Sequence, residues 1–322
     1  MRILITGATG LIGSEIVRLC REKNIDVHYL TTRSSKLISA DGYRGFLWNP
    51  NKGEIDGNCF EGVSAIINLA GASISKRWTE SYKREVLNSR INSIKTLHNG
   101  LRNINTNQIT SFVSASAIGI YPTSLSNFYA EDHTQVDASF LGEVVEAWEG
   151  ALKPLEKYGF SLAKIRIGLV MSSEGGALPE MARPVKYFAG SAIGSGQQWQ
   201  SWIHITDLAR IFLYAAEHQL QGVYNGVGPN PVTNAKLVKE IAKVLKRPLF
   251  LPNVPKFALR LLLGEMSYIL FASQRVSSKK IEEAGFIFQY QNVCRALEQI
   301  YPQKAKAYKH GLNTTEDTKE YV

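Results

Sequence analysis

Short apolar runs alternate with amphipathic stretches along the first 230 residues. The apolar runs, typical of strands buried on both faces, fall at residues 3–5, 64–71, 109–116 and 162–170, with shorter strand patterns at 26–29 and 46–48 and a further strand and turn at 222–229. The intervening stretches have apolar residues at helical spacing, at 11–20, 79–102, 139–155 and 208–215. Strand and helix patterns that alternate predict an α/β fold on a doubly wound, Rossmann-type parallel sheet.

The first strand leads into a glycine-rich turn. Gly7, Gly10 and Gly13 follow at three-residue spacing, and a helical pattern opens at Leu11. Gly7 permits a tight turn, Gly10 lets the backbone approach phosphate groups, and Gly13 lets helix and strand pack closely. Because the first amides of a helix attract anions, the turn predicts a pyrophosphate site. The alternative is an ordinary turn between a strand and a helix.

The second strand ends in a polar segment without a carboxylate. Thr32 and Arg33 occupy the position where many dinucleotide-binding proteins place an acidic residue for the ribose of NAD, and Lys36 is nearby. A guanidinium suits the 2′-phosphate of NADP through bidentate contacts. The segment therefore favours NADP(H) over NAD, although a surface arginine in a polar loop is the simpler alternative.

These motifs resemble the extended, epimerase-like branch of the short-chain dehydrogenase/reductase superfamily. Residues 6–13 fit its T-G-x-x-G-x-x-G turn, and residues 68–71 (N-L-A-G) fit its N-x-A-G element. The resemblance implies that Leu69, Ala70 and Gly71 lie against the cofactor. It also implies a catalytic Ser or Thr at the end of the strand at 109–116, where Ser116 is the first candidate and Ser114 the second.

The catalytic pair of that superfamily, Tyr-x-x-x-Lys, is missing. The helix at 139–155 is predicted where the pair should lie, but the matching register has Phe140 and Val144. A phenyl ring has no proton to transfer, so the usual acid/base mechanism is excluded there. Glu143 and Glu146 on the same helix could do acid/base work if one faces the pocket, although surface glutamates are the simpler interpretation. Tyr121 matches the tyrosine of the turn after Ser116, which in the superfamily does not transfer the proton.

Residues 190–207 combine a glycine-rich loop with two tryptophans. Trp199 and Trp202 are predicted to wall a pocket. Thr206 or Asp207 is predicted to cap the helix that follows. His204, in a lone His-x-x-Asp, is expected to be structural rather than catalytic.

A longer series of motifs resembles one atypical group of extended enzymes, usually labelled "epimerase family protein". The matching stretches are 68–71, 77–78, 89–90, 175–178, 194–198, 201–207, 225–231, 264–265, 274–275 and 283–286. Members resemble one another in an N-terminal NADP-binding fold and a small C-terminal domain of unassigned function, and they too lack Tyr-x-x-x-Lys. The resemblance implies NADP(H) contacts at Gly7, Thr9, Gly10, Leu11, Ile12, Gly13, Thr32, Arg33, Leu69, Ala70, Gly71, Glu85, Arg90 and Val170. From the residues alone, Glu85 and Arg90 would be solvated or paired on the surface of the long helix.

Charge and cysteine content argue against nucleic-acid binding and against a metal site. The chain of 322 residues carries a net charge of +9, and residues 236–310, with 14 Lys/Arg and 5 Asp/Glu, carry all of that excess. The lysines there recur at helical spacing without a nucleic-acid motif, which favours attraction of an anionic small substrate over nucleic acid. Three isolated cysteines predict a cytoplasmic protein without a metal site. A strand pattern that begins at residue 2 leaves no room for a targeting peptide.

We therefore expect a dinucleotide-binding domain over 1–230, a smaller α/β domain over 231–300 and a flexible tail over 301–322, with parts of 172–205 contributing to the cleft. The apolar segment 255–264, interrupted by Arg260, predicts a packing or pocket-lid element rather than a membrane span, with a membrane-surface role as the alternative. The leading hypothesis is an NADP-dependent oxidoreductase or epimerase. The alternative is a non-catalytic NADP(H) sensor or partner-binding protein. The fold leaves a homodimer open.

Overall fold

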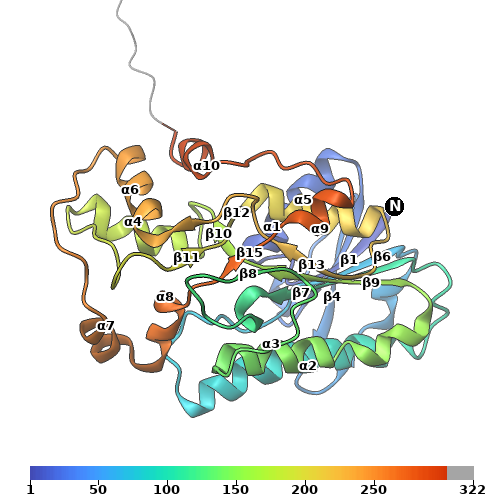
Figure 1. Ribbon diagram of the computed structural model, residues 1–322. Helices are drawn as coiled ribbons and strands as arrows, with labels where there is room; N and C mark the ends of the chain where they lie inside the picture. Colours follow the sequence, from blue (N-terminus) through green and yellow to red (C-terminus); the bar gives the residue numbers. More distant parts are fainter. Residues whose placement is uncertain (303–322) are drawn as a thin grey trace, which may run out of the picture.

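A mostly parallel sheet forms the centre of the molecule in the computed structural model, which describes residues 1–302 (Figure 1). Within those residues the sheet has nine strands, in the order β13-β9-β7-β6-β1-β2-β4-β3, and β5 pairs with β4. The strands are β1 (Arg2–Thr6), β2 (Asp26–Thr31), β3 (Ser39–Ala40), β4 (Tyr43–Asn49), β5 (Glu54–Ile55), β6 (Ala65–Asn68), β7 (Ser111–Ala117), β9 (Ser161–Ile167) and β13 (Gly222–Gly226). From β13 to β4 every pair is parallel, so the predicted fold class is confirmed.

Helices cover both faces of this sheet. In Figure 1, α1 (Leu11–Glu22) and α5 (Ile205–Glu217) lie on one face, and α2 (Glu80–Leu101) and α3 (Phe140–Gly150) on the other. The apolar periodicity explains the packing, because Ile16, Val17 and Cys20 of α1 are all buried. The strand order reverses around β1, which has β6 on one side and β2 on the other. Ligands of open α/β sheets bind in the crevice at the carboxyl ends of the strands at such a point.

A second core lies beside the sheet. Its buried side chains come from α4 (Ala177–Lys186), α6 (Asn234–Val244) and α10 (Val293–Ile300), together with strand residues such as Met171 and Trp202. Short strand pairs connect the two parts: β10 (Leu169–Met171) with β12 (Trp202–His204), β11 (Trp199–Gln200) with β14 (Val232–Thr233), and β8 (Phe128–Tyr129) with β15 (Arg275–Val276). Residues on both sides of position 230 build this core, and the division at that position stays a prediction.

The remaining elements are short. They are the helices α7 (Lys256–Leu263), α8 (Tyr268–Phe271) and α9 (Lys279–Glu283), and the 3-10 turns η1 (Ser34–Lys36), η2 (Gly57–Phe60), η3 (Ile118–Ile120), η4 (Lys153–Tyr158) and η5 (Gly264–Ser267). Within residues 1–302, no helix has the length and apolar character that crossing a bilayer requires. Most of the predicted tail, 303–322, lies outside the described residues.

Three predicted details of the fold were wrong. The helix predicted over 139–155 ends at Gly150, and a 3-10 turn follows. Helix α5 is capped by His204, whose ring accepts a hydrogen bond from the Thr206 amide, and not by Thr206 or Asp207. Trp202 is fully buried in the second core and donates its indole N–H to the Asn230 carbonyl, so it walls no pocket.

Candidate functional site

The glycine turn joins β1 to α1 in a cramped space. Gly7 has a φ of +72°, which side chains with a Cβ rarely adopt, and the Gly10 amide donates to its carbonyl at 2.9 Å. A Cβ on Gly13 would lie 2.2 Å from the Gly7 oxygen, so only glycine fits there. Thr9 and Gly10 are exposed, Leu11 and Ile12 are half-buried, and the first turn of α1 carries no acidic residue. The start of α1 therefore offers free amides to an anion.

A buried polar cluster fixes the neighbouring strand end. The Thr6 hydroxyl donates to Asn68 Oδ1 at 2.7 Å and accepts from the backbone amides of Leu69 and Ala70, each at 3.0 Å. Ser93 of α2 also donates to Asn68 Oδ1, at 2.8 Å. These bonds hold the segment after β6 against Gly7, where a Cβ would lie 3.2 Å from the Leu69 carbonyl carbon. The predicted Asn68–Gly71 element thus lies beside the glycine turn.

Arg90 of α2 lies under the next residue, Gly71. A Cβ on Gly71 would lie 3.2 Å from Arg90 Cγ. The guanidinium donates to the carbonyls of Ala72 and Val86 and stacks over the Trp148 ring at 4.9 Å. Its Nε has no partner, and no carboxylate in the described part of the chain pairs with it. Burial lowers the pKa of Arg90 to about 10, as expected for a cation without a counter-ion.

The other predicted contacts lie around this crevice at different depths. Thr32 and Arg33 are exposed at the carboxyl end of β2, where Arg33 precedes the turn η1. Val170 is half-buried in β10. Glu85 is exposed on α2, and Arg90 bonds backbone carbonyls rather than this carboxylate.

Ser116 belongs to a buried polar network. Its hydroxyl donates to Glu149 Oε1 at 2.6 Å, and Glu149 also pairs with Arg166, whose Nε lies 2.9 Å from the same oxygen. Arg166 donates in turn to the Tyr121 hydroxyl at 2.9 Å, and that hydroxyl donates to Asn225 Oδ1 at 2.8 Å. Burial raises the pKa of Tyr121 even though Arg166 opposes the shift. The hydroxyl predicted to polarise a substrate therefore faces α3 and Glu149.

A groove of about 610 Å³ lies between the beginnings of α2 and α3 and the C-terminal segment. On the side of α2 and α3, Trp78 and Phe140 meet edge to face with ring centroids 5.1 Å apart. On the other side are Lys256 and Arg260 of α7 and the ring of Tyr268. The groove thus combines aromatic walls with two cations and the Glu265 carboxylate. Glu143 and Glu146 line an adjoining hollow along α2 and α3.

Tyr268 connects the two sides of this groove. Its hydroxyl lies 2.8 and 2.9 Å from the two carboxylate oxygens of Asp137. Asp137 also accepts from the amides of Ser139 and Thr123. Burial, with the neighbouring Asp137, raises the pKa of Tyr268 to about 12. The phenol therefore stays protonated near neutral pH and donates a hydrogen bond to the Asp137 carboxylate.

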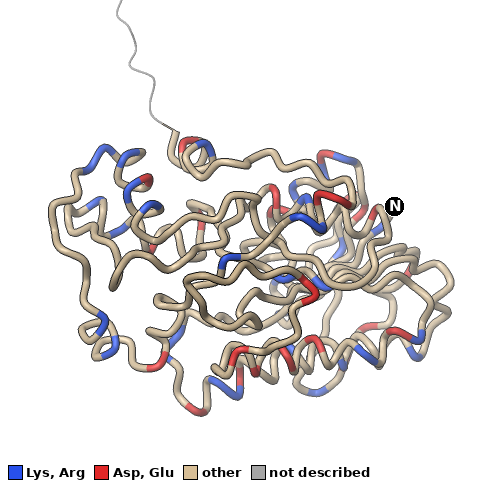
Figure 2. The backbone as a smooth tube through the Cα atoms, viewed as in Figure 1, with Lys and Arg blue, Asp and Glu red and all other residues tan. Residues whose placement is uncertain are grey.

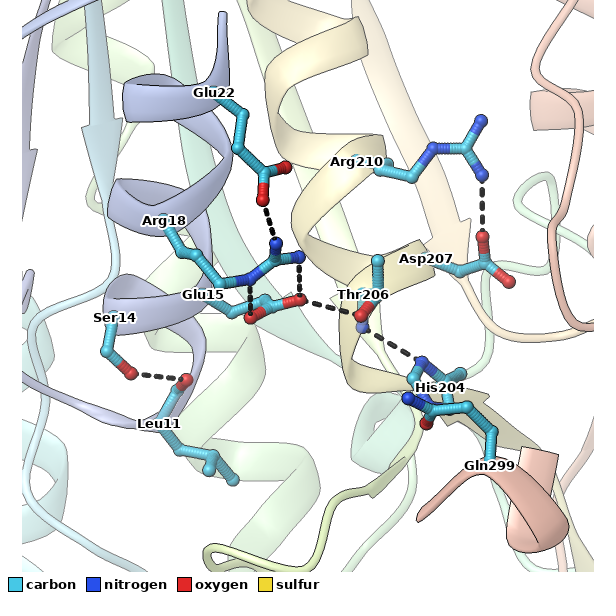
Figure 3. Close-up of polar contacts among 10 residues, drawn as sticks. All are labelled: Leu11, Ser14, Glu15, Arg18, Glu22, His204, Thr206, Asp207, Arg210 and Gln299. Carbon is cyan, nitrogen blue, oxygen red and sulfur yellow. Dashed lines mark hydrogen bonds and ion pairs between the residues drawn. The ribbon is translucent and has the colours of Figure 1, made fainter. Parts of the chain in front are cut away.

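On the opposite face of α1, a charged cluster holds the helix in place (Figure 3). The Thr206 hydroxyl donates to Glu15 Oε1 at 2.6 Å, and Glu15 pairs with Arg18 at 2.8 Å. His204 Nε2 lies 2.9 Å from Gln299 Oε1 of α10, so its ring joins the cap of α5 to the last helix. Burial lowers the pKa of His204. The cluster thereby fixes the start of α1, on which the glycine turn depends.

These features fit a dinucleotide phosphate. The glycine turn leaves room for a pyrophosphate at free helix amides, and Arg90 is a half-buried cation beside it whose Nε has no partner. The exposed Arg33 at the end of β2 fits a further phosphate.

Comparison with known proteins identifies the family to which the chain belongs. The model of the NAD dependent epimerase/dehydratase family matches residues 3–226, and a domain of unknown function, DUF1731, matches residues 254–300. The chain belongs to the NAD-dependent epimerase/dehydratase family. Among its curated relatives, "Epimerase family protein SH2119" of Staphylococcus haemolyticus is 37% identical over 306 residues, which cover 93% of this chain and 98% of that protein.

Two further members of the epimerase/dehydratase family are similar over nearly the whole chain. "Epimerase family protein SDR39U1 homolog, chloroplastic" of Arabidopsis thaliana is 36% identical over 311 residues, covering 93% of this chain and 86% of that protein. The solved structure of human epimerase family protein SDR39U1 (isoform 2) with NADPH has a TM-score of 0.80 and 27% identity, and the match covers 94% of this chain and 99% of that one. The resemblance to the epimerase family protein group is thereby confirmed.

Sequence patterns missed the buried Glu149–Arg166 pair and the Asp137–Tyr268 contact. The second joins residues 131 positions apart, and no periodicity links them. For the first, a signal was present: Arg166 interrupts an apolar strand, and a charge in a buried strand requires a partner.

Proposed function

We propose that this epimerase/dehydratase family protein binds NADP(H) in the crevice at the glycine turn and acts on a small anionic substrate. The observation that carries the proposal is the half-buried guanidinium of Arg90, which has no carboxylate partner and whose buried Nε has no hydrogen-bond partner, beside the free amides of α1. An anion at that point offsets the burial of the cation. The human relative was solved with NADPH, and Arg33 without a neighbouring carboxylate suits the 2′-phosphate.

The chain's residues divide the work of binding. The amides of Leu11, Ile12 and Gly13, with Thr9, hold the pyrophosphate, and Gly7 and Gly10 let the backbone approach it. Leu69, Ala70 and Gly71 lie against the ribose. Thr32 and Arg33 receive the 2′-phosphate, and Glu85 and Val170 complete the contacts. NADP(H), when bound, supplies a hydride or accepts one.

The groove supports an oxidoreductase or epimerase activity. Lys256 and Arg260 supply positive charge for an anionic substrate, and Trp78 and Phe140 supply a flat apolar wall. Because Phe140 has no proton to give, the proton must come from another group. Ser116 stays our candidate for polarising the substrate, and it requires a rotation of its hydroxyl away from Glu149.

One observation favours the alternative, a non-catalytic NADP(H) sensor. The Ser116 hydroxyl already donates to Glu149 in a network that is satisfied without a substrate. With Phe140 in place of the catalytic tyrosine and Ser116 hydrogen-bonded to Glu149, such a protein would bind the dinucleotide but have no evident proton donor. A broad panel of carbonyl substrates, followed by NADPH oxidation, distinguishes the two functions.

The cofactor assignment is tested by Arg33→Ala. We expect NADPH binding to weaken about 10- to 150-fold, because a charge-assisted phosphate contact is worth about 1.5–3 kcal/mol, while NADH binding changes little. Fluorescence titration measures both affinities, and Arg102→Ala, at the exposed far end of α2, is the control. Equal losses of affinity for the two nucleotides would contradict the NADP assignment.

The cytoplasmic location and the homodimer stay predictions.

A further inference from the structure

Exposed apolar side chains gather on one lobe of the molecule. Among the described residues, fifteen large hydrophobic side chains are exposed, and eight of them lie in residues 181–190 and 241–264. The eight are Tyr187, Phe188, Leu249, Phe250, Leu251, Phe257, Leu261 and Leu262. Leu261 is 88% exposed, and Tyr187, Phe257 and Leu262 are each more than 70% exposed. Such a concentration of exposed apolar side chains within 34 residues marks an interaction site.

The two segments lie side by side. Ser191 donates to the Pro252 carbonyl at 2.6 Å, and Ile193 bridges to Val254. The Arg247 guanidinium stacks over the Phe188 ring at 4.8 Å. Helix α7 follows directly in the chain, and in Figure 1 it lies below α4 and α6 at the same end of the molecule. Residues 181–190 and 241–264 thus form one surface, here called the basic apolar surface.

The charge of the basic apolar surface is mostly positive, although three carboxylates, Glu180, Glu240 and Glu265, border its two segments. Its seven charged residues are Arg183, Lys186, Lys243, Lys246, Arg247, Lys256 and Arg260, all exposed, and neither segment contains Asp or Glu. Figure 2 shows these positive positions along α4, α6 and α7. Surfaces that bind protein partners are depleted of lysine, of which this surface has four. Seven cations against three bordering carboxylates leave a positive excess, which matches an anionic surface instead.

Helix α7 has the arrangement of an interfacial helix. Phe257 and Leu261, four residues apart, form one ridge that faces solvent. Lys256 and Arg260 form the adjacent ridge, which lines the groove at its rim. A helix whose apolar ridge faces outward beside a cationic ridge fits the boundary between lipid headgroups and acyl chains.

We propose that the basic apolar surface binds the anionic surface of a lipid bilayer, with Phe250, Phe257 and Leu261 entering the headgroup region and the surrounding cations contacting phosphate groups. Aromatic and leucine side chains with basic residues are the combination that holds peripheral proteins at such membranes. The groove then opens next to the bilayer, since Lys256 and Arg260 belong to both. The proposal does not depend on the NADP(H) site.

Co-sedimentation of the full chain with vesicles tests the proposal. We expect binding to vesicles of phosphatidylcholine and phosphatidylglycerol in equal parts, and at least about tenfold weaker binding to phosphatidylcholine alone or at high salt. The double variant Phe257→Glu/Leu261→Glu should lose binding. The double variant Lys246→Glu/Arg247→Glu should weaken it by at least about fivefold for each lost cation.

Matched controls lie elsewhere on the chain. Ile287→Glu changes an isoleucine that is 75% exposed outside the basic apolar surface, and Lys52→Glu/Lys95→Glu reverses two exposed charges far from it. Both should bind vesicles as the wild type does. Thermal unfolding and NADPH titration of every variant show whether the fold and the nucleotide site are intact.

Four outcomes would overturn the proposal: no vesicle binding by the wild type, equal binding with and without phosphatidylglycerol, equal losses in the control variants, or a wild-type dimer that Leu261→Glu converts to a monomer without any vesicle binding. The last result would assign the surface to contacts between two copies of the chain. A protein that binds vesicles as described but not NADPH would contradict the proposed function and leave this proposal standing.

Discussion

Arg90→Met removes a half-buried guanidinium that lies beneath Gly71 without a carboxylate partner among residues 1–302. Burial lowers the pKa of Arg90 to about 10, from an ordinary value above 12, and each pKa unit is worth about 1.4 kcal/mol. Keeping the charge in place therefore costs about 3 kcal/mol in the free protein. Because the pKa of Arg90 in the folded state lies below its unfolded value, this cost is complete at pH 7 and declines only as the pH rises through about 10.

Methionine fills much of the same space without the charge. The variant loses two hydrogen bonds to backbone carbonyls, each worth about 1 kcal/mol, and the contact with the Trp148 ring. These losses offset most of the relieved cost. We therefore expect the free energy of unfolding of the unliganded variant to stay within about 1 kcal/mol of the wild type.

Nucleotide binding should respond much more strongly. A lost charge-assisted contact to phosphate is worth about 1.5–3 kcal/mol, which corresponds to about 10- to 150-fold in affinity for NADPH and for NADH alike. Fluorescence titration gives the affinities, and thermal unfolding with and without NADPH gives the stabilisation by ligand. Arg102→Met, at the exposed end of the same helix, is the control. An affinity within about twofold of the wild type, together with a much less stable fold, would show that Arg90 is purely structural.

Three further changes test other parts of the account. Gly13→Ala places a Cβ 2.2 Å from the Gly7 backbone oxygen. We expect the free energy of unfolding to fall by about 1–3 kcal/mol in thermal unfolding, and titration to show no NADPH binding. The control Gly57→Ala, with open space around it, should change neither quantity. Burial holds the pKa of His204 below its unfolded value, so the free energy of unfolding has its full value above about pH 6.5 and falls as the pH drops below it. Denaturation at pH 7.5 and 5 should show a smaller fall in His204→Asn, where an amide can still cap the helix. Glu149→Gln leaves Arg166 buried without its counter-ion and should lower the free energy of unfolding by about 3–5 kcal/mol in the same assay, and a loss below about 1 kcal/mol would contradict the buried pair.

The parts of the fold that follow from local pattern were predictable. The strand, glycine turn and helix at residues 2–22 were confirmed as elements because each residue's role there depends on its immediate neighbours. The predicted α/β sheet was confirmed for the same reason, since fully apolar strands alternate with amphipathic helices.

Features that depend on distant residues were not predictable. Trp202 lies in the second core because α4 and α6 close over it, and nothing in residues 190–207 indicates that. Local propensity favours Thr or Asp as a helix cap, but the buried ring of His204 takes the position while the Asp207 carboxylate accepts the amides of Gln289 and Tyr290. The apolar ridge of α7 illustrates the opposite case. Its pattern is clear in the sequence, but only the structure shows that Phe257 and Leu261 face outward.

The measurement that tests the central claim most directly is a titration of the purified full chain with NADPH and, in parallel, with NADH, followed by nucleotide fluorescence. The crevice at the glycine turn, with Arg90 unpaired beneath it and Arg33 at its edge, predicts saturable binding of both nucleotides at one site, with NADPH bound more tightly. Failure of both nucleotides to bind would contradict the account, because the glycine turn and the buried cation would then have no anion to hold.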